Sequence, residues 1–282
     1  MSDAISGKAR VAGVMGWPVA HSRSPRLHNW WIRRHGLDAA YIPMPVPPDR
    51  LAEALRALPA LGMRGCNLTL PHKEAALAVL DEVDPAARRI GAVNTVVVQA
   101  DGRLRGSNTD AFGFLANLRV GAPDWHGSAG PAVVLGAGGG ARAVVAALLE
   151  ADVPEVRLVN RSLERAERLA LDLGGPVRVL GWDAREDALG GAALLVNTTQ
   201  LGMDGQPPLD LRLDGLPPGA VVTDIVYTPL ETALLAAARA RGNAVVDGLG
   251  MLLHQARPGF EAWFGVAPEV TPALRDFVLA SL

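Results

Sequence analysis

Short apolar runs alternate with amphipathic segments through the second half of the chain. Segments Glu164–Leu173 and Glu231–Arg241 carry apolar residues at helical spacing, which predicts helices. The apolar runs between such segments predict strands at Ala132–Leu135, Val156–Asn160, Val177–Leu180, Leu194–Asn197, Val221–Ile225 and Ala244–Val246. Strands that alternate with helices are typical of a parallel sheet with helical crossovers, so we predict an α/β fold for this half.

The first half of the chain has a more mixed pattern. We predict a strand over Arg10–Met15, followed by a helix with Ser24 as its N-cap and Pro25 in its first turn. An amphipathic helix is predicted over Asp49–Leu58, with Asp49 as its cap. Further along we predict a strand over Arg64–Leu70, a helix from Pro71 to about Leu80, a hairpin of Asn94–Gln99 and Arg103–Ser107, and a helix from Asp110.

Composition and charge describe an ordinary globular protein. Of 282 residues, 49% are hydrophobic and 20% charged, and the formal net charge of −2 gives no general attraction to nucleic acid or anionic membrane. The single cysteine, Cys66, excludes an intrachain disulfide and a Cys-rich metal site. The amino terminus lacks a signal-peptide pattern, and no apolar run reaches the roughly 18 residues of a membrane span. We therefore expect a soluble, cytoplasmic protein.

A glycine turn joins the strand at 132–135 to an apolar helical segment. Gly136, Gly138 and Ala141 fall on the G-x-G-x-x-G/A spacing. In a dinucleotide-binding turn the first glycine allows the bend, the second lets the backbone approach a pyrophosphate, and the small third residue lets helix pack on strand. The helix amino terminus then faces an anion. The alternative is a glycine turn that serves only the packing of strand and helix.

The end of the next strand indicates which dinucleotide is used. NAD sites place an acidic residue there for the ribose 2′-hydroxyl, and Asn160-Arg161-Ser162 contains none. Arg161 can bind a 2′-phosphate, Ser162 can donate to it, and Arg165 adds charge one helical turn on. The sequence therefore favours NADP, although a basic helix start paired with neighbouring glutamates would give the same pattern.

Two candidate polar groups in the first half each admit two interpretations. Ser22 and Ser24 lie just before a predicted helix amino terminus, where two hydroxyls can hold a carboxylate or simply begin the helix. Lys73 lies in the first turn of a predicted helix, a position that the helix dipole disfavours for a cation. Such a lysine is either a solvated surface group or a functional one.

Nine separated stretches resemble the shikimate dehydrogenase family, NADP-dependent enzymes that reduce 3-dehydroshikimate to shikimate, and they occur in family order. In chain order they are Gly16–Pro25, Asn67–Lys73, Gly91–Thr95, Asn108–Asp110, the glycine turn, Asn160–Ser162, Asn197–Met203, Asp224–Tyr227 and Asp247–Gln255. The resemblance implies two α/β domains, an amino-terminal substrate domain of residues 1–110 plus 248–282 and a Rossmann-type NADP domain of residues 111–247. The carboxy-terminal segment would pack on the first domain.

The resemblance also implies roles for individual residues. Lys73 and Asp110 would be catalytic, with Lys73 acting as proton donor or as electrostatic clamp. Substrate would be bound by Ser22, Ser24, Thr69, Asn94, Tyr227 and Gln255. The implied cofactor contacts are Gly136, Ala137, Gly138, Gly139, Gly140, Ala141, Asn160, Arg161, Ser162, Arg165, Thr198, Gly248 and Met251. No metal, nucleic acid or membrane is expected, and the protein would be a monomer or homodimer.

Two positions depart from the family pattern. Gln200 stands where a smaller residue or proline is expected near the nicotinamide half, and Ala111 replaces a common glycine. The nearest alternative is a quinate/shikimate dehydrogenase relative with broader substrate or NAD use. An alternative of another class is a non-catalytic NADP-binding sensor, which the presence of Lys73 and Asp110 disfavours.

Overall fold

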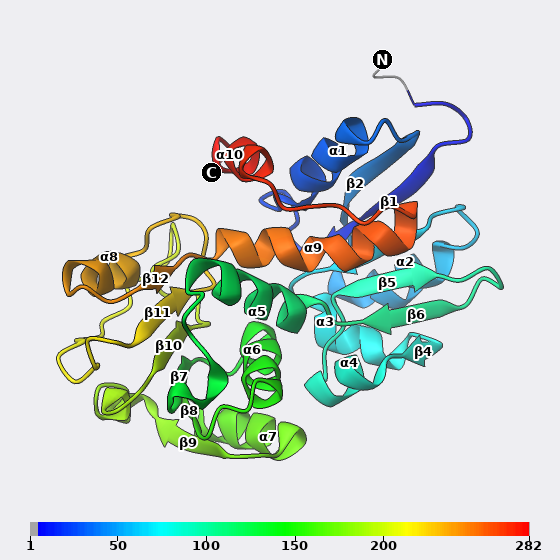
Figure 1. Ribbon diagram of the computed structural model, residues 1–282. Helices are drawn as coiled ribbons and strands as arrows, with labels where there is room; N and C mark the ends of the chain where they lie inside the picture. The colour runs from blue at the N-terminus through cyan, green and yellow to red at the C-terminus, as the bar shows by residue number, and fades with distance from the viewer. Residues whose placement is uncertain (1–4, 282) are drawn as a thin grey trace. The chain divides into compact units, whose positions relative to one another are not determined.

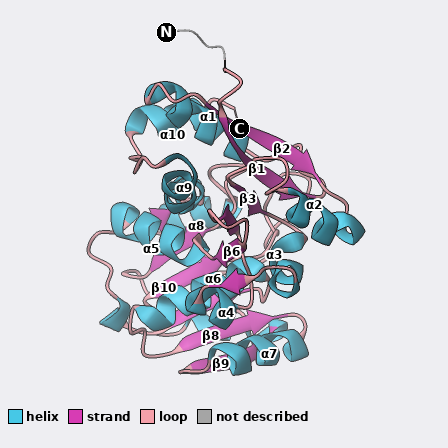
Figure 2. Cartoon of the chain, turned by 90° about the vertical axis from the view of Figure 1, so that its right-hand side faces the viewer, coloured by secondary structure: helices cyan, strands magenta, loops and turns pink. Residues whose placement is uncertain are grey.

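The computed structural model describes residues 5–281 and divides them into two compact units (Figure 1). Unit 1 comprises residues 5–109 and 255–281, and unit 2 comprises residues 110–254. Each unit has its own six-stranded sheet flanked by helices (Figure 2). Within the described residues, no helix combines the length and the apolar character that crossing a membrane would require.

The sheet of unit 1 is mixed. Its strands, in spatial order, are β2 (Ala39–Pro45), β1 (Arg10–Gly16), β3 (Gly65–Leu68), β5 (Thr95–Val98), β6 (Leu104–Ser107) and β4 (Glu82–Val83). Strands β2, β1 and β3 run parallel, whereas β5 is antiparallel to both β3 and β6. The predicted hairpin is confirmed, with Val98 opposite Leu104 across a turn in which Gly102 has φ of +82°.

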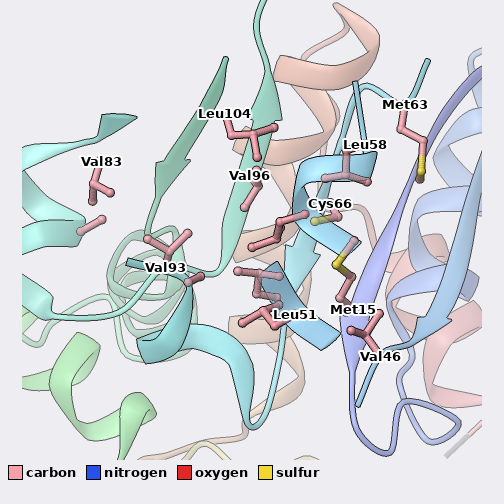
Figure 3. Close-up of a cluster of buried hydrophobic side chains, with 14 residues drawn as sticks. Met15, Val46, Leu51, Leu58, Met63, Cys66, Val83, Val93, Val96 and Leu104 are labelled. Carbon is pink, nitrogen blue, oxygen red and sulfur yellow. The ribbon is translucent and has the colours of Figure 1, made fainter. Parts of the chain in front are cut away.

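The helices of unit 1 are short apart from two. They are α1 (Ser24–Arg34), α2 (Leu51–Ala57), α3 (His72–Ala75), α4 (Pro85–Ile90), the second half of α9 (Leu249–Phe264) and α10 (Pro272–Leu279). The core between α2 and the sheet is aliphatic, and Figure 3 shows Met15, Leu51 and Val96 converging on it. Cys66 lies in the same core as a free, buried thiol, and burial raises its pKa.

A second core of unit 1 is aromatic. His28 and Trp31 of α1 and Tyr41 of β2 contact Phe260 and Trp263 of α9. The indole of Trp263 donates to the carbonyl of Val96 at 3.0 Å, which attaches the end of α9 to the sheet. Segments more than 200 residues apart in sequence therefore build one core.

Unit 2 contains a fully parallel sheet, as predicted. Its order is β12 (Val245–Val246), β11 (Val221–Asp224), β10 (Leu194–Asn197), β7 (Ala132–Leu135), β8 (Val156–Asn160) and β9 (Val177–Gly181). This is the doubly wound order of a dinucleotide-binding fold, with its reversal point between β7 and β10. The helices are α5 (Asp110–Gly121), α6 (Gly139–Glu150), α7 (Leu163–Leu173), α8 (Ala233–Ala240) and the start of α9.

Three local predictions for unit 1 were wrong. Helix α1 begins at Ser24, so Arg23 rather than Ser24 occupies the cap position, and no side chain caps this helix. The backbone of Arg23 is already near the helical region, with φ of −89° and ψ of −7°. Asp49 does not cap α2, since a 3-10 turn at 48–50 precedes that helix. The helix predicted from Pro71 to about Leu80 is only one α-helical turn followed by a 3-10 turn.

Candidate functional site

In unit 1 the carboxyl ends of β1 and β3 lie side by side, since Met15 pairs with Leu68 in a parallel register. The amide of Thr69 donates to the carbonyl of Met15 at 2.9 Å, and the amide of Trp17 donates to Leu70 at 3.1 Å. The two loops that follow these strands are therefore held together. One loop leads to Ser22 and Ser24, and the other carries Thr69 and Lys73.

Strand β5 brings its amino end to the same edge because it runs antiparallel to β3. The amide of Leu68 donates to the carbonyl of Asn94 at 2.8 Å, and the amide of Val93 donates to the carbonyl of Lys73 at 2.8 Å. Helix α3 is thus attached to the residue before Asn94. The structure therefore gathers Thr69, Lys73 and Asn94 at one edge of the sheet, as the predicted substrate site requires.

Asn94 is buried and its side chain is fully oriented by hydrogen bonds. Its Oδ1 accepts from the amide of Thr109 at 2.9 Å, and its Nδ2 donates to Oε1 of Gln255 at 3.2 Å. Gln255 comes from α9, more than 150 residues further along the chain. Two of the predicted substrate-binding residues are thereby in direct contact.

The two serines lie at the amino terminus of α1, an 11-residue helix. Ser24 is buried as its first residue, and Ser22 is partly exposed in the preceding turn. No acidic side chain lies in the first helical turn. Helix-terminal amides together with two hydroxyls favour an anion, which suits a carboxylate.

In unit 2 the glycine turn has the geometry that its sequence predicts. Gly136 has φ of +102°, and a Cβ added there would lie 2.8 Å from Oγ1 of Thr198. Thr198 is itself fixed, because its hydroxyl donates to the carbonyl of Leu135 at 2.6 Å. A side chain at Gly136 would therefore meet both backbone strain and a clash.

The next two glycines face open space. Gly138 precedes the 12-residue helix α6 as its cap residue, and Gly139 begins it. Apart from chain neighbours and the helix's own backbone, no atom of the described residues lies within 4 Å of a Cβ added at either glycine. Packing within the described residues therefore does not explain these glycines, whereas close approach of a pyrophosphate to the helix amino terminus does. By contrast, Ala141 is fully buried, in agreement with its predicted role in packing helix on strand. The turn fits a dinucleotide.

The end of β8 presents a basic, acid-free turn. The side-chain Nδ2 of Asn160 donates to the carbonyl of Ser162 at 2.8 Å, and Oγ of Ser162 accepts from the backbone amide of Arg165 at 3.4 Å as the cap of α7. Because the Ser162 hydroxyl acts as an acceptor in this cap, it can still donate its own proton to an anion. Arg161 and Arg165 are exposed on either side of this cap. The turn suits a 2′-phosphate.

The remaining predicted residues lie in unit 2. Asp110 is the buried first residue of α5, Tyr227 is partly exposed after β11, and Met251 is buried in α9. Gly248 is required by packing, since an added Cβ would lie 2.5 Å from the carbonyl oxygen of Ile225. Gln200, the departure from the family pattern, is exposed in the loop after β10.

Sequence reasoning missed several residues that hold the site. Tyr41, Asn67, Thr95 and Thr109 are buried polar residues bonded to Asn94 or to one another. Tyr41 falls in β2, which was not predicted. Asn67, Thr95 and Thr109 fall within stretches that resemble the family, but no role was predicted for them.

Family models match most of the chain. A shikimate dehydrogenase substrate-binding domain matches residues 14–96, a shikimate/quinate 5-dehydrogenase model matches 124–200, and a shikimate 5′-dehydrogenase carboxy-terminal domain matches 248–275. The shikimate dehydrogenase (NADP(+)) of Rhodospirillum rubrum is 66% identical over 98% of this chain and 99% of its own.

Two solved structures of dehydrogenases are similar to this chain in both sequence and fold. Shikimate 5-dehydrogenase from Thermus thermophilus, in complex with NADP(H) and shikimate, is 41% identical with a TM-score of 0.85, over 97% of this chain and 100% of its own. Quinate dehydrogenase from Corynebacterium glutamicum, in complex with NAD, is 33% identical with a TM-score of 0.90, over 96% and 99%.

The doubly wound unit and its glycine turn, joined to a separate α/β unit with a polar edge, define a dinucleotide-dependent oxidoreductase. It uses NADP and acts on a CH–OH group. The chain belongs to the shikimate dehydrogenase family.

Proposed function

We propose that the chain catalyses the reversible reduction of 3-dehydroshikimate to shikimate with NADPH, as its relatives' names indicate. The observation that carries the proposal is the polar edge of unit 1, where Thr69, Lys73, Asn94 and Gln255 are brought together from three separate stretches. A polyhydroxylated ring needs this density of donors and acceptors.

Substrate is assigned to residues 1–110 plus 248–282, and the cofactor to residues 111–247. Ser22 and Ser24 hold the substrate carboxylate at the amino terminus of α1, where their two hydroxyls lie at the positive end of the helix dipole. Thr69, Asn94 and Gln255 contact the ring hydroxyls. Tyr227 is assigned to the carboxylate.

Lys73 and Asp110 carry the chemistry. NADPH, when bound, supplies a hydride to the substrate carbonyl, and the alkoxide that results needs a proton donor or a cation beside it. The Lys73 ammonium supplies both, and it either donates its proton or stabilises the charge while Asp110 orients it. Asp110 directly follows Thr109, whose amide is bonded to Asn94.

For the cofactor, Gly136 to Ala141 form the pyrophosphate cradle. Asn160, Arg161, Ser162 and Arg165 surround the adenosine 2′-phosphate, since Arg161 directly follows β8 and no acidic residue lies between β8 and α7. Thr198, Gly248 and Met251 are assigned to the nicotinamide half. The open space at Gly138 and Gly139 supports the assignment of the pyrophosphate to this turn.

Initial rates of the purified protein test the function. Oxidation of shikimate with NADP⁺ is followed at the absorbance of NADPH, in parallel with quinate and with NAD⁺. We expect shikimate with NADP⁺ to give the highest kcat/KM by a wide margin. Equal use of quinate or NAD⁺ would move the chain to the broader quinate/shikimate class, for which the quinate dehydrogenase likeness stands as precedent. NADPH binding without turnover would indicate a sensor.

We also assign the protein to the cytoplasm, and we expect it to be a monomer or a homodimer. Light scattering coupled to gel filtration distinguishes these two states by mass, given 29.5 kDa for one chain. A larger assembly would contradict the assignment.

A further inference from the structure

Asp224 is a buried acidic residue at the carboxyl end of β11, and sheets of this kind bind their ligands at the carboxyl ends of their strands. Its Oδ1 accepts from the backbone amide of Val226 and from Nδ2 of Asn197, each at 3.0 Å. Its Oδ2 bonds to the hydroxyl of Thr232 at 2.8 Å. Burial raises the pKa of Asp224, and these three hydrogen bonds oppose that effect. One side chain therefore joins the end of β10, the segment after β11 and the start of α8.

Asn197, the last residue of β10, holds the loop that follows it. Its Oδ1 accepts from the backbone amide of Thr199 at 3.0 Å, and its Nδ2 donates to the carbonyl of Leu201 at 3.2 Å. A backbone amide can only donate and a carbonyl can only accept, so these two bonds fix the orientation of the Asn197 side chain. The bond to Asp224 restrains this oriented amide, and through it the loop that contains Thr198.

Val226 connects Asp224 to a second segment. The carbonyl oxygens of Ile225 and Val226 lie 2.5 and 2.6 Å from a Cβ added at Gly248, so the backbone after β11 packs directly on this glycine. The amide of Ile225 also donates to the carbonyl of Asn197 at 3.0 Å. The loops that follow β10 and β11 are therefore held at one point of the sheet edge.

We propose that Asp224 is a positioning residue for the nicotinamide half of NADP. It acts on the loop of Thr198 through the amide of Asn197, and it acts on Gly248 through the backbone of Val226. This inference rests on the proposed assignment of Thr198 and Gly248 to that half of the cofactor. The turn after β8, to which the adenosine 2′-phosphate is assigned, takes no part in these bonds.

The test variant is Asp224→Ala, with the binding of two ligands measured by calorimetry. NADPH carries both halves of the cofactor, whereas adenosine 2′,5′-bisphosphate carries only the adenosine half with its 2′-phosphate. We expect Kd for NADPH to rise about 10-fold, the size of one lost hydrogen bond, and Kd for the bisphosphate to stay unchanged. A Kd for NADPH that rises no more than that for the bisphosphate would overturn the proposal.

Turnover gives a second measurement of the same effect. We expect kcat of Asp224→Ala, per site counted with the bisphosphate, to fall about 10²-fold, because a small misplacement of a reacting group has a cost of this size. KM for shikimate should stay unchanged. Asp224→Asn keeps one acceptor oxygen for Asn197 and Val226, so it should restore Kd and kcat to nearly the wild-type values. An asparagine variant as impaired as the alanine variant would contradict positioning by hydrogen bonds.

The matched control is Asn243→Ala, at the opposite end of the same strand. Asn243 is a buried polar residue of unit 2, and its Nδ2 donates to the carbonyls of Pro217, Pro218 and Ala220 at 2.9, 3.1 and 2.9 Å. These carbonyls precede β11, whereas Asp224 ends it. The control should lower the melting temperature without changing either Kd. An equal rise of Kd for NADPH in the control would show general weakening of the fold instead of positioning.

The outcomes differ from those that test the proposed function. If wild-type protein fails to oxidise shikimate, the function itself is wrong, and the comparison of the two ligands still tests Asp224. If the wild type is active and Asp224→Ala binds NADPH equally well, only the role of Asp224 is lost. Should Asp224→Ala fail to fold, Asp224→Ser with the same two ligands decides the question, since one hydroxyl nearer the backbone cannot replace two carboxylate oxygens.

Discussion

His28 is the residue whose burial has the largest electrostatic consequence. It lies fully buried in the aromatic core of unit 1, and neither ring nitrogen has a hydrogen bond of ordinary geometry among the described residues. Burial lowers its pKa to about 3, an effect that the side chain of Asn67 opposes. Between about pH 3 and pH 6.5 the ring is therefore neutral in the folded protein and charged in an unfolded chain.

The folded protein should lose stability in mild acid because of His28. The unfolded chain binds a proton below about pH 6.5 and the folded chain only below about pH 3, so stability rises with pH between these values. Between pH 7 and pH 4.5 this group should cost about 2.5 kcal/mol of unfolding free energy. Urea unfolding of wild type and His28→Phe at both pH values measures it. Equal losses in the two proteins would contradict the prediction.

Replacing Lys73 should stop the chemistry more than the binding. Lys73→Ala should lower kcat at least about 10²-fold, the range for losing a proton donor, with a smaller change in KM for shikimate. Lys73→Arg distinguishes the two open roles, since a guanidinium keeps the charge but does not release a proton. The control is Lys8→Ala, the chain's other lysine, which is exposed near the amino terminus. Near-normal turnover of Lys73→Ala would remove this residue from the mechanism.

At the scale of elements, the junction of β8 and α7 sets the cofactor preference. Arg161→Asp restores the acid that NAD sites carry and should invert the ratio of kcat/KM for NADP⁺ over NAD⁺. Arg168→Asp is the control on the same helix, where the guanidinium lies 3.6 Å from Asp172 and away from the turn. A ratio that hardly moves in Arg161→Asp would show that the turn does not bind the 2′-phosphate.

The elements of unit 2 were predictable and those of unit 1 less so, for a physical reason. Parallel strands buried on both faces, such as Ala132–Leu135, are continuous apolar runs that stand out in a sequence. In unit 1, β2 has an exposed face and two prolines, Pro43 and Pro45, which hide it. The start of α1 was misplaced by one residue because the backbone of Arg23 is already near the helical region, which the sequence pattern of Ser24 and Pro25 does not reveal.

Only some residues of the candidate site could be predicted from the sequence. The order of motifs assigned Asn94 and Gln255 to one substrate site, and the structure places their side chains in hydrogen-bond contact. Tyr41, whose hydroxyl donates to Asn67, belongs to a strand that carries no motif. Spacing along the chain carries no information about such a partner.

At the scale of the whole molecule, each unit has its own hydrophobic core, so each should respond separately to its ligand. NADP⁺ at about 100 times its Kd stabilises the part that binds it by about 2.7 kcal/mol. Hydrogen exchange should therefore slow in peptides spanning β7, α6 and the start of α7 more than in peptides of β2 and β3. NAD⁺ at the same concentration should slow hydrogen exchange in these peptides less than NADP⁺ does. Protection confined to unit 1 would contradict the assignment of the cofactor.

The aromatic core has a consequence for how the protein is made. Trp31 and Tyr41 are synthesised before unit 2, whereas Phe260 and Trp263 of α9, which contact them, are synthesised after it. Unit 2 lies wholly between these segments and can bury its core first. During translation the aromatic side chains of unit 1 therefore stay exposed until α9 has been synthesised, so unit 1 completes its core after unit 2.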